Sequence, residues 1–260
     1  MRPVHALRET NLSVHSDWAL FLDVDGTLLH IAETPDAARV SLELRTAIQA
    51  LSPSLGGAVA LVSGRSLADL DRLFAPLELP CAGQHGLERR DSSGGIHRLG
   101  EPGTLDPLRA PLQRFVRDHP GALLEDKGLS LAVHYRRTPD IADLARKSVE
   151  ALVRAHDHRF QLLHGKLVSE VKLRAADKGV AIEAFMREAP FAERRPVFVG
   201  DDVTDEHGFA VVNRSGGYSV HVGYGEETCA RYRLDDVNEV IAWLSAGPAG
   251  FADKQGASTT

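Results

Sequence analysis

The stretch Asp23-Val24-Asp25-Gly26-Thr27-Leu28 directly follows the apolar run Ala19–Leu22. A short, continuously apolar run is typical of a strand buried on both faces of a parallel sheet. Asp23 and Asp25 are two residues apart, so their side chains project from the same face of the extended segment, and Gly26 allows a sharp turn. Asp-Gly is also a common turn by itself. Because ligands bind beyond the carboxyl ends of such strands, the stretch predicts a site with two carboxylates.

Similar apolar runs recur along the chain and alternate with helical patterns. The clearest runs are Ala58–Val62, Val197–Val199 and Ser219–Val222. Ser66 and Asp177 each precede a stretch with apolar residues at helical spacing, which is the position of an N-cap. Strands that alternate with helices predict βαβ units and a doubly wound α/β domain.

The middle of the chain has a different pattern. Apolar and polar residues alternate within Leu129–Arg136 and Lys166–Leu173, which predicts strands with one buried and one polar face in an antiparallel sheet. Helical stretches around Leu108–Arg117 and Ile141–Arg154 would cover the buried side. We therefore expect an inserted α+β domain over residues 106–174.

Composition limits the classes of function. The chain has 260 residues, 43% of them hydrophobic and 25% charged, with a formal net charge of −6. A mildly acidic chain without a basic run gives no reason to expect nucleic acid or a membrane surface as a partner. Its two cysteines are too few for disulfides to stabilise a fold of this size. No segment approaches the ~20 apolar residues of a membrane span. A cytoplasmic protein is expected.

A second acidic cluster follows the run Val197–Val199. The segment Gly200–Glu206 carries four carboxylates, which repel one another unless a cation lies among them. Hard oxygen ligands with room for water suit Mg²⁺. A helix N-terminus that carries acids to match its dipole would explain Asp205 and Glu206, but less readily Asp201.

Two further segments have groups suited to binding phosphate. In Asp177-Lys178-Gly179, Lys178 stands at a helix start, where it opposes the helix dipole unless an anion binds nearby. In Ser63-Gly64-Arg65, which follows a predicted strand, Ser63 offers a hydroxyl and Gly64 permits close backbone approach. Considered alone, Lys178 could be a surface lysine. The segment Ser63-Gly64-Arg65 alone is only weak evidence for phosphate binding. Their order in the chain, together with the two acidic stretches, gives them weight.

These four segments, in this order, resemble the motifs of the haloacid-dehalogenase superfamily of phosphatases. The resemblance covers the parallel domain, residues 1–105 and 175–260, and implies that the insertion is a cap domain. It implies that Asp23 is the nucleophile, forming a phospho-aspartate, and that Asp25 is the general acid and then base. The phosphoryl oxygens would be held by Ser63 with Gly64, and by Lys178, which the resemblance also places among the catalytic residues.

The resemblance also implies a magnesium site. Mg²⁺ would be bound by the carboxylate of Asp23, the backbone carbonyl of Asp25 and the carboxylate of Asp201. Asp202 and Asp205 would support these ligands.

Within the superfamily, the chain is similar to the trehalose-6-phosphate phosphatases. The matching segments are Gly83-Gln84-His85-Gly86 with Glu88, Glu125–Ser130, His134-Tyr135-Arg136 and Gly165–Glu170. This likeness implies hydrolysis of trehalose 6-phosphate, in trehalose biosynthesis, with a cap that sets specificity and a functional pairing with a trehalose-phosphate synthase. The expected substrate-binding residues are Arg65, His85, Glu125, Lys127, Ser130, His134, Arg136, Lys166 and Glu170.

Other functions stay open at this level. An ordinary solvated sheet face would also account for the polar residues of the insertion. The nearest enzymatic rival is another capped sugar-phosphate phosphatase, acting on sucrose phosphate or mannosylglycerate phosphate. A receiver-like signalling module would share a strand-end aspartate and a lysine, but it is about half this length and lacks the second aspartate. A non-catalytic regulatory partner of a synthase should have lost a motif residue, and none is missing.

Overall fold

The computed structural model divides the chain into two compact units. The first comprises Met1–His97 and Asp177–Thr260, and the second Arg98–Ala176, so that the expected insertion over 106–174 falls inside the second unit. The residues described are 4–7, 13–32, 37–101, 103–156, 159–165, 167–224 and 227–247. The C-terminal segment from Gly247 is rich in Gly, Ala, Ser and Thr, a composition that predicts disorder, and its residues 248–260 lie outside the described ranges.

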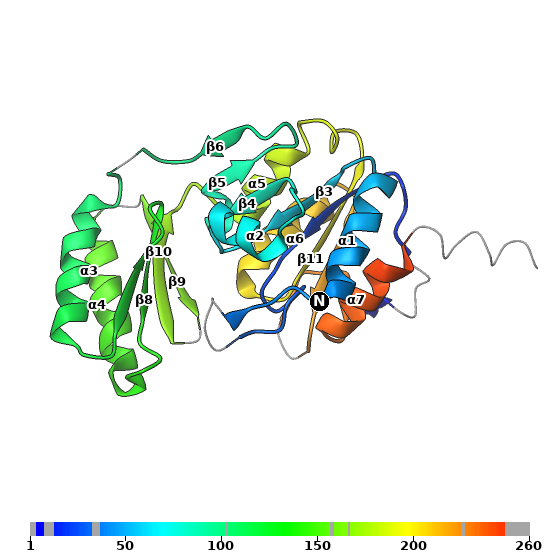
Figure 1. Ribbon diagram of the computed structural model, residues 1–260. Coiled ribbons are helices and arrows are strands. Elements are labelled where there is room, and N and C mark those ends of the chain that lie inside the picture. Colours follow the sequence, from blue (N-terminus) through cyan, green and yellow to red (C-terminus); the bar gives the residue numbers. More distant parts are fainter. Residues whose placement is uncertain are drawn as a thin grey trace, which may run out of the picture. The chain divides into compact units, whose positions relative to one another are not determined.

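The first unit is built on a mostly parallel sheet (Figure 1). Within the described ranges, its strand order is β1-β13-β12-β11-β2-β3-β4-β5-β6. The antiparallel pairing of β4 with β5 departs from the parallel pattern. The strands are β1 His5–Ala6, β2 Trp18–Leu22, β3 Val59–Val62, β4 Cys81–Gly83, β5 Glu88–Arg90, β6 Ile96–Arg98, β11 Arg195–Gly200, β12 Tyr218–Val222 and β13 Tyr232–Leu234.

The order of these strands places a topological switch between β2 and β11. From β2 the chain continues outward to β3 and β4, and after the second unit it returns to β11 and continues in the opposite direction to β12 and β13. Strands β2 and β11 are parallel neighbours, with Leu22 opposite Val199. Open α/β sheets bind ligands at the carboxyl end of such a switch. Asp23 and Asp201 follow these two strands.

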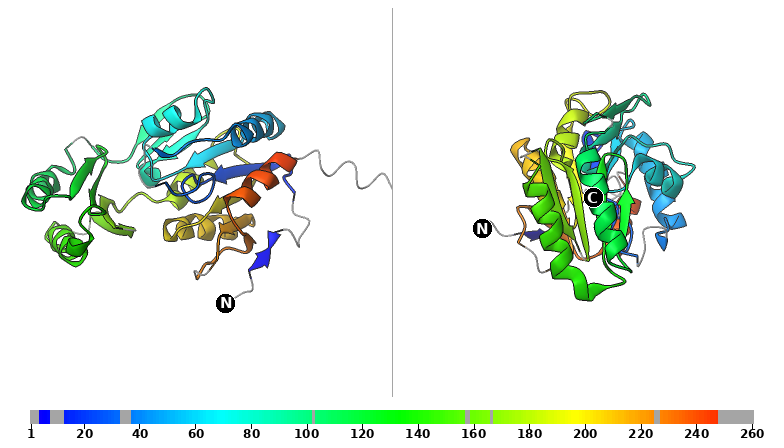
Figure 2. Two further views of the ribbon diagram at one scale, coloured as in Figure 1. Left: turned by 60° about the horizontal axis from the view of Figure 1, so that its bottom comes forward. Right: turned by 90° about the vertical axis from the view of Figure 1, so that its left-hand side faces the viewer.

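Helices cover both faces of the sheet, as the alternation of strands and helices predicted. Helices α1 (Leu42–Ser54), α2 (Leu67–Phe74) and α7 (Val237–Ala246) share one apolar cluster with the sheet, and α5 (Lys178–Phe185) and α6 (Glu206–Arg214) share the other. Helices α1 and α7 pack side by side (Figures 1 and 2). All five residues of β2 are buried, because they alternate between the two clusters.

Side-chain caps fix where two of these helices begin. The hydroxyl of Ser66 accepts a hydrogen bond from the amide of Asp69 at 3.1 Å, and the carboxylate of Asp177 accepts one from the amide of Val180 at 2.8 Å. Both N-caps agree with the sequence prediction. The cap at Asp177 makes Lys178 the first residue of α5.

The second unit is a four-stranded antiparallel sheet with two helices on one face, counting only its described residues. The strand order is β7-β8-β10-β9, and α3 and α4 lie side by side over the sheet (Figure 2). Leu131, Val133 and Val171 point into the core with residues from both helices. The elements are α3 Asp106–Asp118, β7 Leu123–Asp126, β8 Ser130–His134, a short 3-10 helix Pro139–Ile141, α4 Ala142–Arg154, β9 Phe160–Gly165 and β10 Val168–Leu173.

The second sheet is less strictly two-sided than its sequence predicted. Ser130 and Lys172 alternate with the core residues, yet neither is more than 1% exposed. The ammonium of Lys172 donates to the backbone carbonyls of Leu173 and Ala176. Buried charged groups require such partners, and the sequence pattern alone does not show them.

Among the residues that the structure describes, no helix has both the length and the apolar character needed to cross a membrane.

Candidate active site

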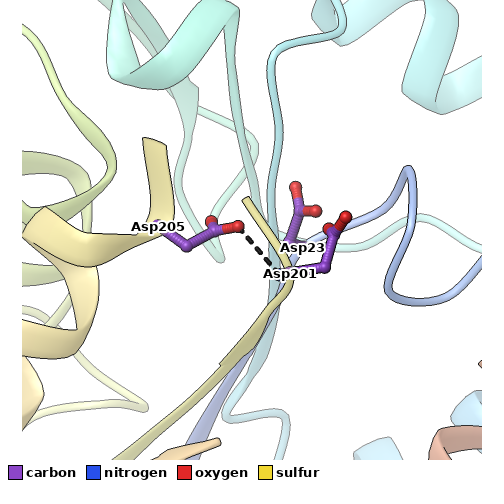
Figure 3. Close-up of side chains that lie close together, drawn as sticks. All are labelled: Asp23, Asp201 and Asp205. Atoms are coloured by element: carbon purple, nitrogen blue, oxygen red, sulfur yellow. Dashed lines mark hydrogen bonds between the residues drawn. The ribbon is translucent and has the colours of Figure 1, made fainter. Parts of the chain in front are cut away.

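Three carboxylates converge at the switch point of the first unit. Asp23 follows β2, Asp201 follows β11, and Asp205 belongs to the short 3-10 helix Val203–Asp205 before α6. One oxygen from each carboxylate lies within 4.8 Å of the others (Figure 3). The amide of Asp23 also donates to the carbonyl of Val199 at 2.9 Å, which ties the two strand ends together.

Lys178 enters this cluster from the first turn of α5. Its ammonium lies 2.7 Å from Oδ1 of Asp23 and 2.7 Å from Oδ1 of Asp205. All three side chains are nearly inaccessible to solvent, with 3%, 5% and 0% of their surface exposed, respectively. A buried lysine between two carboxylates is not a surface lysine, so the surface interpretation of Lys178 is wrong.

Asp205 organises the loop that carries Asp201. Its Oδ2 accepts hydrogen bonds from the amides of Asp201 at 3.0 Å and Asp202 at 2.9 Å, while its Oδ1 pairs with Lys178. Both carboxylate oxygens of Asp205 are therefore engaged by the protein, Oδ1 by the ammonium of Lys178 and Oδ2 by two backbone amides. Asp202 is exposed and caps the 3-10 helix through the amide of Val203.

Burial sets the electrostatics of the cluster. Burial raises the pKa of Asp23 well above 3.8, and repulsion from Asp205 and Asp201 adds to the effect, although Lys178 opposes it. Burial and then Asp205 raise the pKa of Asp201 to about 6. Burial alone would lower the pKa of the Lys178 ammonium, but Asp205 and Asp23 more than offset it and the pKa is raised. The negative charge exceeds what one lysine balances, so a divalent cation with oxygen ligands fits this cluster.

The turn after Asp25 requires glycine. Gly26 has a φ of +89°, and a Cβ there would lie 2.7 Å from Oδ1 of Asp201 and closer still to the rest of that carboxylate. Thr27, which is fully buried, donates to the same Oδ1 at 3.0 Å. The two residues after Asp25 thus fix the position of Asp201, far away in the sequence.

Asp25 pairs with Arg65 rather than with the acidic cluster. The guanidinium of Arg65 binds both carboxylate oxygens, with Nε 2.6 Å from Oδ2 and a terminal nitrogen 2.6 Å from Oδ1. Such a two-point contact fixes the plane of the carboxylate. Arg65 is one of the expected substrate-binding residues, and in the structure its guanidinium is engaged with Asp25.

The segment Ser63–Arg65 follows β3, next to β2. Ser63 is buried, and its hydroxyl accepts from the amide of Arg65 at 3.2 Å. The imidazole of His85 lies so close to Gly64 that a Cβ at Gly64 would be only 2.7 Å from Nε2 of His85. The expected phosphate-binding segment thus lies at the same edge of the sheet as Asp23.

The second unit carries two groups of the expected substrate-binding residues on its sheet. Nε2 of His134 on β8 lies 2.8 Å from Oε2 of Glu125 on β7. Oε1 of Glu170 on β10 accepts from the hydroxyl of Ser130 at 2.7 Å and lies 3.3 Å from the ammonium of Lys127. The polar side chains therefore form two networks that bridge neighbouring strands.

Two more expected substrate-binding residues are in this unit. Arg136 is exposed just beyond the end of β8. Lys166 lies outside the described residues.

The model of the trehalose-phosphatase family matches residues 21–238. The chain belongs to the trehalose-phosphatase family. It is 47% identical over 223 residues to a probable trehalose-phosphate phosphatase of Sinorhizobium fredii, a match that covers 84% of each chain. It is 44% identical over 228 residues to the trehalose-6-phosphate phosphatase of Escherichia coli, covering 87% of this chain and 85% of the relative.

The solved structures show the same fold. The C-terminal domain of C. albicans trehalose-6-phosphate phosphatase superposes with a TM-score of 0.78 at 24% identity, covering 87% of this chain and 91% of that one. The expected haloacid-dehalogenase fold is confirmed. As a member of the trehalose-phosphatase family the chain is a phosphatase, and the receiver-like alternative is wrong.

Two residues of the site were quoted in the family motifs without a role. Thr27 is part of the first motif, and the structure shows that it holds Asp201. Glu88 follows Gln84-His85-Gly86, and its Oε1 accepts from the side chain of Gln84 at 2.9 Å. Their positions inside motifs of the trehalose-phosphatase family were the available sign of a role in the site. Their hydrogen-bond partners, Asp201 and Gln84, could not be identified without the fold.

Proposed function

We propose that this protein hydrolyses trehalose 6-phosphate to trehalose and inorganic phosphate through a phospho-aspartate on Asp23, with Mg²⁺ as the metal. The observation that carries the proposal is the placement of Asp23, buried at the switch point with Lys178 and Asp201 beside it. The family membership supports the substrate, since relatives at 44–47% identity carry the names of trehalose-phosphate phosphatases.

In the first step, a carboxylate oxygen of Asp23 attacks phosphorus and the bond between phosphorus and the sugar oxygen breaks. Asp25 gives its proton to the departing sugar oxygen. Ser63 and Lys178 hold the phosphoryl oxygens during the transfer. A covalent intermediate of this kind divides one difficult hydrolysis into two easier displacements.

In the second step, Asp25 takes a proton from a water molecule, and the resulting oxygen attacks phosphorus. Phosphate leaves and the carboxylate of Asp23 is restored. Because Asp25 alternates between acid and base, its orientation matters in both steps, and we assign this positioning to Arg65, which holds both oxygens of Asp25.

The cluster around Asp23 suits Mg²⁺. The carboxylates of Asp23 and Asp201 and the backbone carbonyl of Asp25 would hold the ion, with Asp205 and Asp202 in support. When bound, it would neutralise charge between the aspartates and the phosphoryl group.

Recognition of the sugar is assigned to the second unit as a cap. Groups that bind only phosphate and metal cannot distinguish one phosphomonoester from another, whereas sugar hydroxyls need fixed donors and acceptors. The paired networks of Glu125 with His134 and of Glu170 with Ser130 and Lys127 supply both kinds of group. Arg136 and Lys166 would add to this set.

We also propose where the reaction takes place in the cell and which enzyme supplies its substrate. We place the reaction in the cytoplasm, downstream of a trehalose-phosphate synthase whose product this enzyme consumes.

The proposal is tested by phosphate release from a panel of sugar phosphates. We expect magnesium-dependent turnover with the highest kcat/KM for trehalose 6-phosphate. Higher kcat/KM for sucrose phosphate or mannosylglycerate phosphate would replace the substrate assignment. Undiminished turnover in excess EDTA would contradict the role of the metal.

A further inference from the structure

The turn after β4 has an unusual backbone. Gln84 and His85 have φ angles of +49° and +57°, so that two consecutive residues other than glycine adopt the left-handed conformation. This conformation is uncommon for such residues. The turn lies at the carboxyl edge of the sheet, because β4 is the neighbour of β3 (Figure 1). Strained backbone of this kind is frequent at active sites, where the surrounding structure maintains it.

Hydrogen bonds on several sides hold the turn in place. The amide of Gln84 donates to the carbonyl of Arg65 at 2.8 Å, and that of His85 donates to the carbonyl of Ser63 at 2.9 Å. The carboxylate of Glu88, only 7% exposed, accepts from the side chain of Gln84 at 2.9 Å and from the first amide of α2 at 3.0 Å. The turn is therefore fastened to the segment Ser63–Arg65 and to the helix that follows it.

The result of this arrangement is the position of one side chain. The imidazole of His85 covers the face of Gly64 where a side chain would start, since a Cβ there would lie 2.7 Å from both Cε1 and Nε2. His85 is half-buried, whereas its neighbour Gln84 is 2% exposed. The strained turn thus keeps a partly accessible imidazole on the central residue of the expected phosphate-binding segment.

We propose that His85 contacts the phosphoryl group itself and donates a hydrogen bond to it during transfer, instead of binding the sugar. This inference rests on the proposed function of Ser63 and Gly64 in holding phosphate. A donor fixed beside developing negative charge lowers the barrier without any covalent step of its own. The contribution is then the same for every phosphomonoester, which separates His85 from the sugar-recognising residues of the second unit.

The test uses His85→Gly with Glu193→Gly as its matched control. Glu193 is an exposed residue with a φ of +65°, so glycine relieves the same backbone strain there. We expect neither variant to have a lower Tm than the wild type. His85→Gly should lose at least about tenfold in kcat/KM on trehalose 6-phosphate and on p-nitrophenyl phosphate alike, and its Ki for orthovanadate should rise by a similar factor. Glu193→Gly should keep wild-type values.

His85→Asn is the second variant, because asparagine tolerates the left-handed conformation and retains an N–H donor. We expect it to lose less than His85→Gly on both substrates. A loss confined to trehalose 6-phosphate, or no loss on either substrate in both variants, would overturn the inference. If the wild type hydrolyses p-nitrophenyl phosphate but not trehalose 6-phosphate, the substrate assignment fails while the aryl phosphate and orthovanadate still test His85.

Discussion

At the scale of single residues, the neighbouring acidic residues Asp202 and Asp205 have different structural roles. Asp205 is fully buried and is bonded to Lys178 and to two backbone amides, whereas Asp202, three residues earlier, is exposed. Asp205→Ala would leave a buried lysine with a single carboxylate and two amides without their acceptor. We expect it to lower the free energy of unfolding by about 3–5 kcal/mol.

Asp202→Ala is the matched control for that prediction. It removes only a cap from a short 3-10 helix, and we expect a loss of about 1 kcal/mol. Urea unfolding of both variants measures the difference. Equal losses would contradict the structural role assigned to Asp205.

A second prediction at this scale concerns Asp201 as a proposed ligand of Mg²⁺. Asp201 faces Asp23 but is not paired with Lys178, and burial with repulsion from Asp205 raises its pKa to about 6. Saturating Mg²⁺ should raise the Tm of the wild type, since an ion at a hundred times its Kd stabilises by about 2.7 kcal/mol. Asp201→Asn should abolish most of this rise, as measured by differential scanning calorimetry. A full magnesium-induced rise in the variant would place the ion elsewhere.

At the scale of secondary-structure elements, side chains link the strands of the second sheet. Glu125 on β7 is bonded to His134 on β8, and this hydrogen bond is the main cause that lowers the pKa of Glu125 below 4.5. A lowered carboxyl pKa in the folded state means that the ionised form stabilises the fold above pH 4.5. That stability is lost as the pH falls through the lowered value.

This link predicts a pH-dependent effect of Glu125→Gln. About one third of each side chain is exposed, so we expect the variant to be less stable than the wild type by under about 1 kcal/mol at neutral pH. The difference should shrink as the pH falls below 4.5 and vanish once Glu125 is protonated in the folded protein. Urea unfolding curves of both proteins from neutral to acidic pH test it, and a difference that does not change with pH would contradict the role of the ionised Glu125 carboxylate.

Elements differ in how well their sequence predicted them. The strands β2, β3 and β11 follow from continuous apolar runs, because burial on both faces of a sheet favours apolar residues, whereas β12 also buries Ser219 and His221. The contact of Arg65 with Asp25 joins segments 40 residues apart, and no local pattern contains it. The left-handed turn at Gln84 and His85 was equally hidden, since neither residue type requires a positive φ.

At the scale of the whole molecule, we assign binding of the phosphoryl group to the first unit and binding of the sugar to the second. Glu125→Ala, Lys127→Ala and Glu170→Ala should each lower kcat/KM for trehalose 6-phosphate at least about tenfold, because a hydrogen bond to a charged group contributes about 1.5–3 kcal/mol. Turnover of p-nitrophenyl phosphate should change little. Equal losses on both substrates would show that these residues support folding or chemistry instead.

The central claim is that phosphate passes through the carboxylate of Asp23. The most direct test quenches the enzyme in acid during turnover of trehalose 6-phosphate and locates covalent phosphate by peptide mass spectrometry after borohydride reduction, which converts an aspartyl phosphate to homoserine. We predict that the modification lies on Asp23 and that Asp23→Asn keeps its fold but loses at least about 10⁴-fold in kcat. Modification of another residue, or substantial turnover by Asp23→Asn, would contradict the account.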